Sequence, residues 1–362
     1  MNQILDLYVD YLISSTSYTT ATGLSRVTDN RISHDKVTRF LSRREFTSSD
    51  LWGIAKSICK SVEREDAVLV FDDSIEKKPY TDENELISWH FDHAEKRSVK
   101  GINFITALYQ SGNCSAPVGY ELVRKTKKIT NSKTGREQRK APVSKNEHFR
   151  NLLIQAVHNK LKFKYVLADS WFASTKNMHF IKHEAKKEFI MPLKSNRLVA
   201  LSEKDKAEGK FVRIDSVEPG ENILVWPKGV EIALRFSRQV FKDGDGVTGI
   251  LYLVSSDIEL TNEQISTIYK KRWKVEVYHQ SLKGNASLEK SPAKTPRTQA
   301  NHFFASLCAY IRLECVSHMT KLNHTALKNK IYTEGLKRAM IELKKYNPPS
   351  FLQPEFISLL SA

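Results

Sequence analysis

Three acidic residues in this 362-residue chain stand where their carboxylates could act on a phosphodiester. Asp73 and Asp169 each follow a short apolar run, at 67–71 and 165–168, and Glu276 lies in a segment with helical periodicity. Hydrolysis of a phosphodiester requires an activated attacking oxygen and a neutralised leaving oxygen, and two metal ions about 3.5 to 4 Å apart provide both. Mg²⁺ prefers hard oxygen ligands. We therefore predict that Asp73, Asp169 and Glu276 are catalytic and bind two Mg²⁺ ions, for which Mn²⁺ would substitute.

The segment around Glu276 carries further residues suited to phosphate chemistry. On an ideal helix Tyr269, Arg272, Glu276 and Lys283 fall within a sector of about 60°. A solvent-facing helix with an ordinary Arg272–Glu276 ion pair would have a similar composition. The complete spacing Tyr-x2-Arg-x3-Glu-x6-Lys, however, resembles the signature of DDE transposases of insertion sequence family four. This resemblance implies that Tyr269, Arg272 and Lys283 bind DNA phosphates near the cut.

The resemblance also bears on the first carboxylate. Adjacent strand residues point to opposite faces, so only one of Asp72 and Asp73 can face the metal ions. Asp73 is preferred because Ser74 follows it, as in the Asp-Thr/Ser pattern of the family. In related transposases an aromatic residue of an insertion holds a base flipped out of the duplex, and Trp226 is the candidate here. The alternative is that Trp226 is a core residue of a hairpin.

The fold implied by the resemblance is α/β, with an RNase H-like catalytic core interrupted by a β-rich insertion. Apolar runs at 67–71 and 165–168 suit strands buried on both faces, and each would deliver an aspartate to one edge of the sheet. From 195 to 257 the pattern alternates and contains Gly and Pro turns. The expected divisions are a helical DNA-binding domain (1–64), the first part of the core (65–194), the β-rich insertion (195–258), the second part of the core (259–298) and a helical C-terminal region (299–362).

The N-terminal segment contains a pattern that resembles a helix-turn-helix. Two short apolar-faced helices are expected at 21–27 and 32–41, with Ser33 as the cap of the second. Lys36 and Arg39 would then project toward a DNA groove or its phosphates. The alternative is an ordinary helical hairpin with a solvated basic face.

The composition favours a polyanionic partner. Lys and Arg total 57 against 41 Asp and Glu, giving a net charge of +16. No apolar run approaches the ~18 residues of a membrane span, and the N-terminus lacks the pattern of a signal peptide. The spacing of the four cysteines fits neither a zinc site nor a redox pair, which indicates reduced structural thiols. We expect a cytoplasmic, bacterial, nucleoid-associated protein that binds double-stranded DNA.

The resemblance implies cut-and-paste transposition by a homodimer that holds paired ends of the element. The terminal inverted repeats would be cleaved through a hairpin intermediate and joined to target DNA. One alternative is a catalytically silent, transposase-derived repressor or domesticated factor, against which the intact set of carboxylates argues. Another is a structure-specific nuclease on the same scaffold, which would not need strand transfer.

Overall fold

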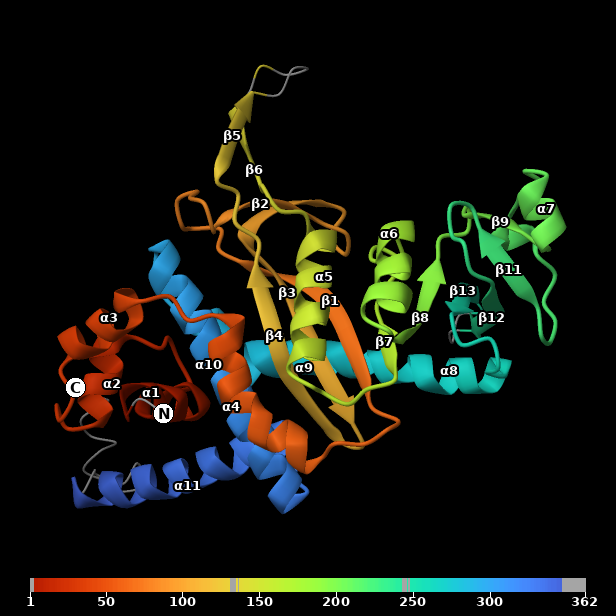
Figure 1. The fold of residues 1–362 in the computed structure, drawn as a ribbon. Coiled ribbons are helices and arrows are strands. Elements are labelled where there is room, and N and C mark those ends of the chain that lie inside the picture. The colour runs from red at the N-terminus through yellow and green to blue at the C-terminus, as the bar shows by residue number, and fades with distance from the viewer. Residues whose placement is uncertain (1–2, 131–134, 136, 243–245, 247, 347–362) are drawn as a thin grey trace.

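The computed structural model describes residues 3–130, 135, 137–242, 246 and 248–346. They form a mixed α/β structure in which the helices of both chain ends lie together beside a large sheet (Figure 1). Four helices precede the first strand: α1 (Gln3–Ser14), α2 (Ala21–Val27), α3 (His34–Arg43) and α4 (Ser48–Ser61). The expected cap of the second short helix is confirmed, because the Ser33 hydroxyl accepts a hydrogen bond from the Lys36 backbone N–H at 3.4 Å.

The middle of the sheet combines antiparallel and parallel strands. β1 (Val68–Lys77), β3 (Arg97–Ser111) and β4 (Cys114–Leu122) are antiparallel neighbours, and β2 (Ser88–Asp92) pairs with the start of β3. β7 (Tyr165–Leu167) lies parallel to β1 on its other side, and β8 (Glu188–Leu193) lies parallel to β7. The central order is therefore β4-β3-β1-β7-β8.

Two strands differ from the sequence-based expectation. β1 was expected to end at residue 71, but it continues to Lys77 because it stays paired with β3 after β7 ends at Leu167. The two aspartates thus lie inside β1 rather than beyond it. The strand β2 was not expected, because its five residues are too few for a clear alternating pattern.

The segment 195–258 adds strands to the same sheet. Its elements are β9 (Leu198–Ala200), α7 (Glu203–Ala207), β10 (Val212–Arg213), a 3₁₀ turn (Ile214–Ser216), β11 (Leu224–Pro227), β12 (Leu234–Lys242) and β13 (Thr248–Ser255). β13 pairs antiparallel with β8, and the sheet continues through β12, β11 and β9 to β10. Backbone hydrogen bonds therefore connect these strands to those that carry the aspartates.

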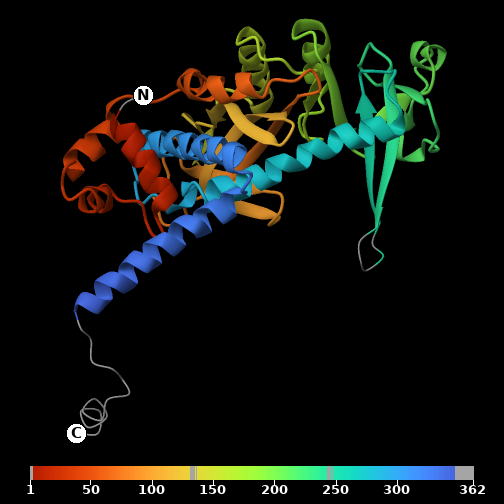
Figure 2. The same cartoon turned by 90° about the horizontal axis from the view of Figure 1, so that it is seen from below.

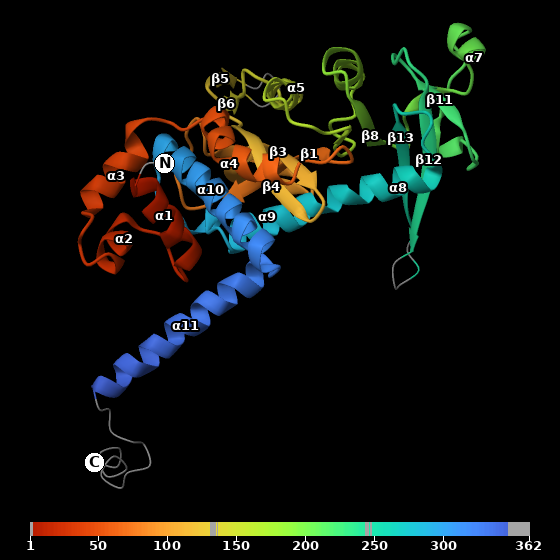
Figure 3. The ribbon, with the colours of Figure 1, turned by 60° about the horizontal axis from the view of Figure 1, so that its bottom comes forward.

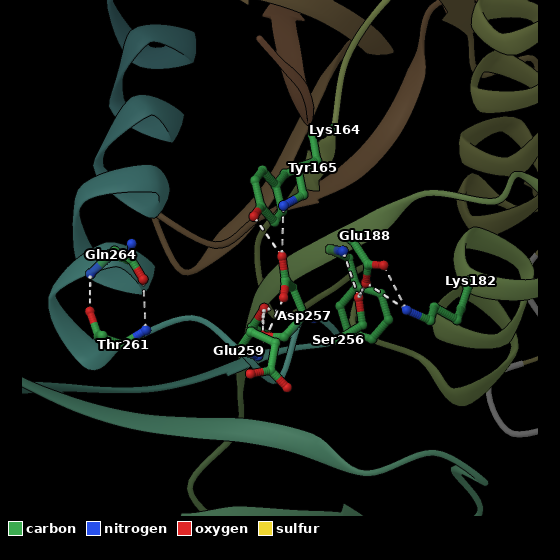
Figure 4. Close-up of polar contacts among 11 residues, drawn as sticks. Lys164, Tyr165, Lys182, Glu188, Ser256, Asp257, Glu259, Thr261 and Gln264 are labelled. Atoms are coloured by element: carbon green, nitrogen blue, oxygen red, sulfur yellow. Dashed lines mark hydrogen bonds and ion pairs between the residues drawn. The ribbon is translucent and has the colours of Figure 1, made fainter. Parts of the chain in front are cut away.

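Polar contacts fix the connection from β13 to the next helix (Figure 4). The Asp257 carboxylate accepts a hydrogen bond from the Tyr165 hydroxyl at 2.8 Å and pairs with Lys164 at 2.9 Å. The Ser256 hydroxyl donates to Glu188 at 2.6 Å. A capping box, in which Thr261 is the N-cap, then begins α8 (Asn262–Lys270). A 3₁₀ turn (Lys271–Trp273) joins α8 to α9 (Lys274–Gly284).

Helices cover both faces of the central strands (Figure 3). On one face lie α5 (Lys145–His158) and α6 (Thr175–His179), which continues as a π turn (Phe180–Glu184). The rings of Phe71 in β1 and Phe149 in α5 are 4.4 Å apart between centroids. On the other face lies α9, where the His279 ring is 5.7 Å from that of Phe104 in β3. Alternate residues of β1 therefore face α5 and α9.

The N-terminal helices pack on α10 (Pro296–Thr320), so the two ends of the chain share a core. The Tyr8 hydroxyl bonds to the His302 ring nitrogen Nδ1 at 2.9 Å. Beyond a 3₁₀ turn (Leu288–Lys290) and α10, the helix α11 (His324–Lys345) extends away from the rest of the molecule (Figures 2 and 3). Among the described helices, none is long and apolar enough to cross a membrane. All four cysteines are free thiols, as expected.

Candidate active site

The candidate site is built around the middle of β1, where Asp72 and Asp73 point to opposite faces of the sheet. Asp72 faces α9, and one donor atom from each of Asp72, Glu276 and His279 lies within 4.8 Å of the others. Asp73 faces α5, where its carboxylate pairs with the Lys145 ammonium at 2.5 Å and accepts a hydrogen bond from Asn103 at 3.0 Å. The structure therefore brings Asp72, rather than the predicted Asp73, to the Glu276 helix.

Asp169 follows the end of β7 and lies next to this position. The parallel register ends at the pair Val70–Leu167, so Asp72 and Asp169 each lie two residues beyond it, and the charge of Asp169 acts on Asp72. The Asp169 carboxylate accepts a hydrogen bond from the Trp171 backbone N–H at 3.0 Å, which fixes its orientation. Two neighbouring parallel strands thus bring carboxylates to one place.

Burial and mutual repulsion perturb these carboxyl groups. Burial raises the pKa of Asp72 to about 8, Arg272 opposes the rise, and the charges of Asp169 and Glu276 add to it. Burial and the charge of Asp73 also raise the pKa of Asp169. Asp72 and Asp169 are therefore less stable as anions here than in water, because they are buried and the guanidinium of Arg272 compensates only part of the negative charge.

The other signature residues lie along α8, the 3₁₀ turn and α9. Tyr269 is buried, and its hydroxyl donates to the Ala168 carbonyl at 3.4 Å, just before Asp169. The Arg272 guanidinium lies 5.9 Å from the Tyr269 ring centroid and 3.4 Å from the Glu276 carboxylate. Tyr269 therefore contacts the strand end, whereas Arg272 lies among the carboxylates.

Lys283 lies one helical turn beyond His279 on the same side of α9. Its ammonium donates to the Ile75 carbonyl at 3.5 Å and is 3.8 Å from the Glu289 carboxylate. The side chain is 30% exposed and lines the pocket that also contains the two aspartates of β1. It is therefore accessible to an anion entering that pocket.

The donor set suits a divalent cation. A bound cation stabilises carboxylates that repel one another, and hard oxygen donors suit Mg²⁺ or Mn²⁺. His279 was not predicted, although it lies three residues after Glu276, on the same helical face. Burial lowers the pKa of His279 to about 3, so its imidazole is neutral and able to bind metal. Its Nε2 atom has no hydrogen-bond partner among the described residues.

A pocket of about 1110 Å³ lies beside the three aspartates. Asp72, Asp73 and Asp169 line it, together with six lysines and five aromatic or imidazole side chains: Lys77, Lys125, Lys140, Lys145, Lys194, Lys283, Trp89, His90, Phe91, His93 and Trp171. The lysines compensate the charge of the aspartates. Such a pocket accommodates a phosphodiester better than a neutral substrate.

The other predicted DNA-binding residues lie away from this pocket. Lys36 and Arg39 are exposed on α3. Trp226 was predicted to hold a flipped base, but its side chain is only 9% exposed, within β11. The structure therefore favours the alternative, in which Trp226 is a core residue of the insertion strands.

Two protein-family models match this chain. The family model described as DDE superfamily endonuclease matches residues 1–209, and the model described as Transposase DDE domain matches residues 125–312. No curated protein has a matching sequence. Seven chains in solved structures match. One belongs to the Drosophila P element transposase strand transfer complex, with a TM-score of 0.28 and 9% identity.

That match covers 54% of this chain and 41% of the P element transposase chain, so this chain corresponds to less than half of that protein. Each of the two family models matches more than half of the 362 residues. The chain belongs to the DDE superfamily of endonucleases and carries a transposase DDE domain.

Proposed function

We propose that this protein is a metal-dependent DNA transposase that cleaves the ends of its own mobile element and joins them to target DNA. The observation that carries the proposal is that Asp72 lies close to Asp169, Glu276 and Arg272, next to a lysine-lined pocket that Asp72 and Asp169 line. The central order β4-β3-β1-β7-β8 supports the RNase H-like core that the sequence resemblance implies. The domain divisions expected from the sequence, with the insertion between β8 and α8, are part of this proposal.

In this mechanism the carboxylates of Asp72, Asp169 and Glu276 hold the metal ions. Bound divalent ions supply activation of the attacking oxygen and neutralisation of the leaving oxygen. Arg272, which already lies among the carboxylates, donates directional hydrogen bonds to the scissile phosphate. Lys283 binds a neighbouring phosphate at the wall of the pocket. Tyr269 orients the strand end through the carbonyl of Ala168.

We assign the first metal-binding carboxylate to Asp72 and a positioning role to Asp73. Asp72 and Glu276 have donor atoms within 4.8 Å of one another, whereas the Asp73 carboxylate is engaged by Lys145 and Asn103. Sequence alone favoured Asp73 because of the serine that follows. The geometry outweighs that pattern, because a metal ligand must face the other ligands.

The experiment uses a labelled duplex that carries the DNA flanking this chain's own coding sequence. Wild-type protein and the variants Asp72→Asn, Asp73→Asn and Glu276→Gln are compared with Mg²⁺, with Mn²⁺ and with chelator. We expect metal-dependent cleavage and joining by the wild type, and a loss of about a thousandfold or more in Asp72→Asn and Glu276→Gln. Asp73→Asn, which is matched in size and charge change, should retain most cleavage.

Three outcomes would revise the proposal. Loss of cleavage in Asp73→Asn but not in Asp72→Asn would show that Asp73, and not Asp72, is the first metal-binding carboxylate. Binding without cleavage by folded wild-type protein would favour a transposase-derived repressor. Cleavage without joining would favour a nuclease. A hairpin product on a denaturing gel, and a complex containing two protomers and two DNA ends, are expected from the proposed dimeric cut-and-paste pathway.

A further inference from the structure

The edge strand β2 presents aromatic side chains in the arrangement of a stacking platform. Its residues alternate between buried and exposed, and Trp89 and Phe91 are each 53% exposed on the same face. Residues two apart on a strand stand side by side, about 7 Å apart. Two large aromatic surfaces are thus exposed to solvent beside each other, although burying them would have been favourable.

The aromatic surface continues from β2 toward the carboxylates. The ring centroids of Phe91 and His93 are 5.0 Å apart, and those of His93 and Trp171 are 6.0 Å apart. Trp171 is 46% exposed and follows Asp169 by two residues, with its backbone bonded to that carboxylate. We call Trp89, Phe91, His93 and Trp171 the aromatic track. All four line the same pocket as the candidate catalytic aspartates.

Lysines border the aromatic track. The ammonium groups of Lys145 and Lys194 lie 5.8 Å and 6.0 Å from the centroid of the Trp171 ring. At the other end, the Lys125 ammonium donates to the backbone carbonyl of Trp89 at 2.5 Å. Aromatic rings interleaved with cations match a ligand that carries flat rings on an anionic backbone.

We propose that the aromatic track binds an unpaired DNA strand next to the cut, with bases stacked on its rings and phosphates on the bordering lysines. A paired duplex keeps its bases inside the stack, so it offers phosphates to the lysines but no free base faces to the rings. The track therefore favours a strand whose pairing is lost beside the scissile phosphate. This inference rests on the proposed function and adds the form of DNA that the site accepts.

The test measures binding by fluorescence anisotropy in the presence of chelator, so that no cleavage is needed. The probes are a short labelled oligothymidylate and a labelled duplex of the same length. The variants are Phe91→Ala, Trp171→Ala and the double variant. The matched control is Phe241→Ala, which removes a ring that is 46% exposed on β12, outside the pocket. Thermal unfolding and circular dichroism verify that each variant is folded.

We expect each track substitution to weaken single-strand binding about tenfold, the usual effect of removing one base–aromatic stack, and to change duplex binding less than about twofold. Phe241→Ala should alter neither. Trp171→Phe, which retains an aromatic face, should recover much of the loss. The inference is overturned if wild-type protein does not bind the single strand, or if the losses are equal for single strand and duplex. It is also overturned if Phe241→Ala causes the same loss.

The test also separates this inference from the proposed function. Glu276→Gln should bind the single strand as wild type does while failing to cleave. If the wild type binds the single strand but does not cleave the duplex, the proposed function is refuted and the inference about the aromatic track still holds. If the wild type cleaves normally but the track variants do not weaken single-strand binding selectively, the inference about the aromatic track is refuted and the proposed function still holds.

Discussion

One side chain, Asn301 in α10, holds the N-terminal helices in place, and its removal should be costly. Its Oδ1 accepts a hydrogen bond from the Phe46 backbone N–H at 3.0 Å, and its Nδ2 donates to the Leu41 and Arg44 carbonyls at 2.7 and 2.6 Å. Only 1% of Asn301 is exposed. Asn301→Ala leaves three backbone groups without their partner, at about 1–3 kcal/mol for each buried group.

We therefore expect Asn301→Ala to lower the free energy of unfolding by about 3 to 6 kcal/mol, allowing for water reaching part of the gap. Urea unfolding followed by circular dichroism measures this change, provided that the transition is two-state. The control is Asn329→Ala, an exposed asparagine on α11, which should change stability by less than about 0.5 kcal/mol. A loss below about 1 kcal/mol in Asn301→Ala would refute the reasoning.

The contacts of Asn301 also bear on DNA binding. They lie at the end of α3 and in the connection to α4, so they set the direction of the helix that carries Lys36 and Arg39. A folded Asn301→Ala protein should therefore lose discrimination between its element end and unrelated duplex more than it loses overall affinity. Competition binding with the two duplexes measures this ratio.

Three further predictions concern stability. Burial lowers the pKa of His302 from 6.5 to about 4. The contribution of this neutral imidazole to the free energy of unfolding is therefore complete above pH 6.5, and it is lost at about 1.4 kcal/mol per pH unit as the pH falls toward 4. In His302→Gln, the free energy of unfolding should depend less steeply on pH between pH 4 and 6.5. Trp226→Ala should destabilise the fold by about 3–5 kcal/mol, as expected for a core residue, whereas Trp171→Ala should cost less than about 0.5 kcal/mol, and calorimetry distinguishes them. Mg²⁺ at about a hundred times its Kd should stabilise the wild type by about 2.7 kcal/mol, and thermal unfolding should show little stabilisation of Glu276→Gln.

Local patterns allowed much of the fold to be predicted. Apolar runs such as those of β1 and β7 have few alternatives to a strand buried on both faces, and the capping residue Ser33 located the start of α3 closely. The signature residues were found because helical spacing is a local property. Pairing between distant strands is not local, so the sequence did not indicate that the strands of segment 195–258 extend the central sheet.

In the site, too, local features could be predicted from the sequence and long-range packing could not. The sequence indicated two adjacent aspartates, but the choice between the faces of β1 depends on where α9 packs, which is a tertiary fact. Tyr269 was expected on the same helical sector as Glu276. The sequence did not indicate the 3₁₀ turn at Lys271–Trp273, which advances about 120° per residue instead of 100° and separates Tyr269 from Glu276. The sequence left two alternatives open for Trp226, because an aromatic residue in a strand has the same pattern whether its side chain is exposed or buried.

The continuous sheet limits how this chain can be shortened. A minimal catalytic fragment made by deleting 195–258 would remove β13 from β8 and leave the apolar sequence of β8, Glu188–Leu193, as an open sheet edge. Edges of this kind recruit strands from other molecules, so the fragment should aggregate rather than remain a monomer. Preparation of a smaller variant would therefore need to retain β13 and β12, or to introduce charged residues along β8.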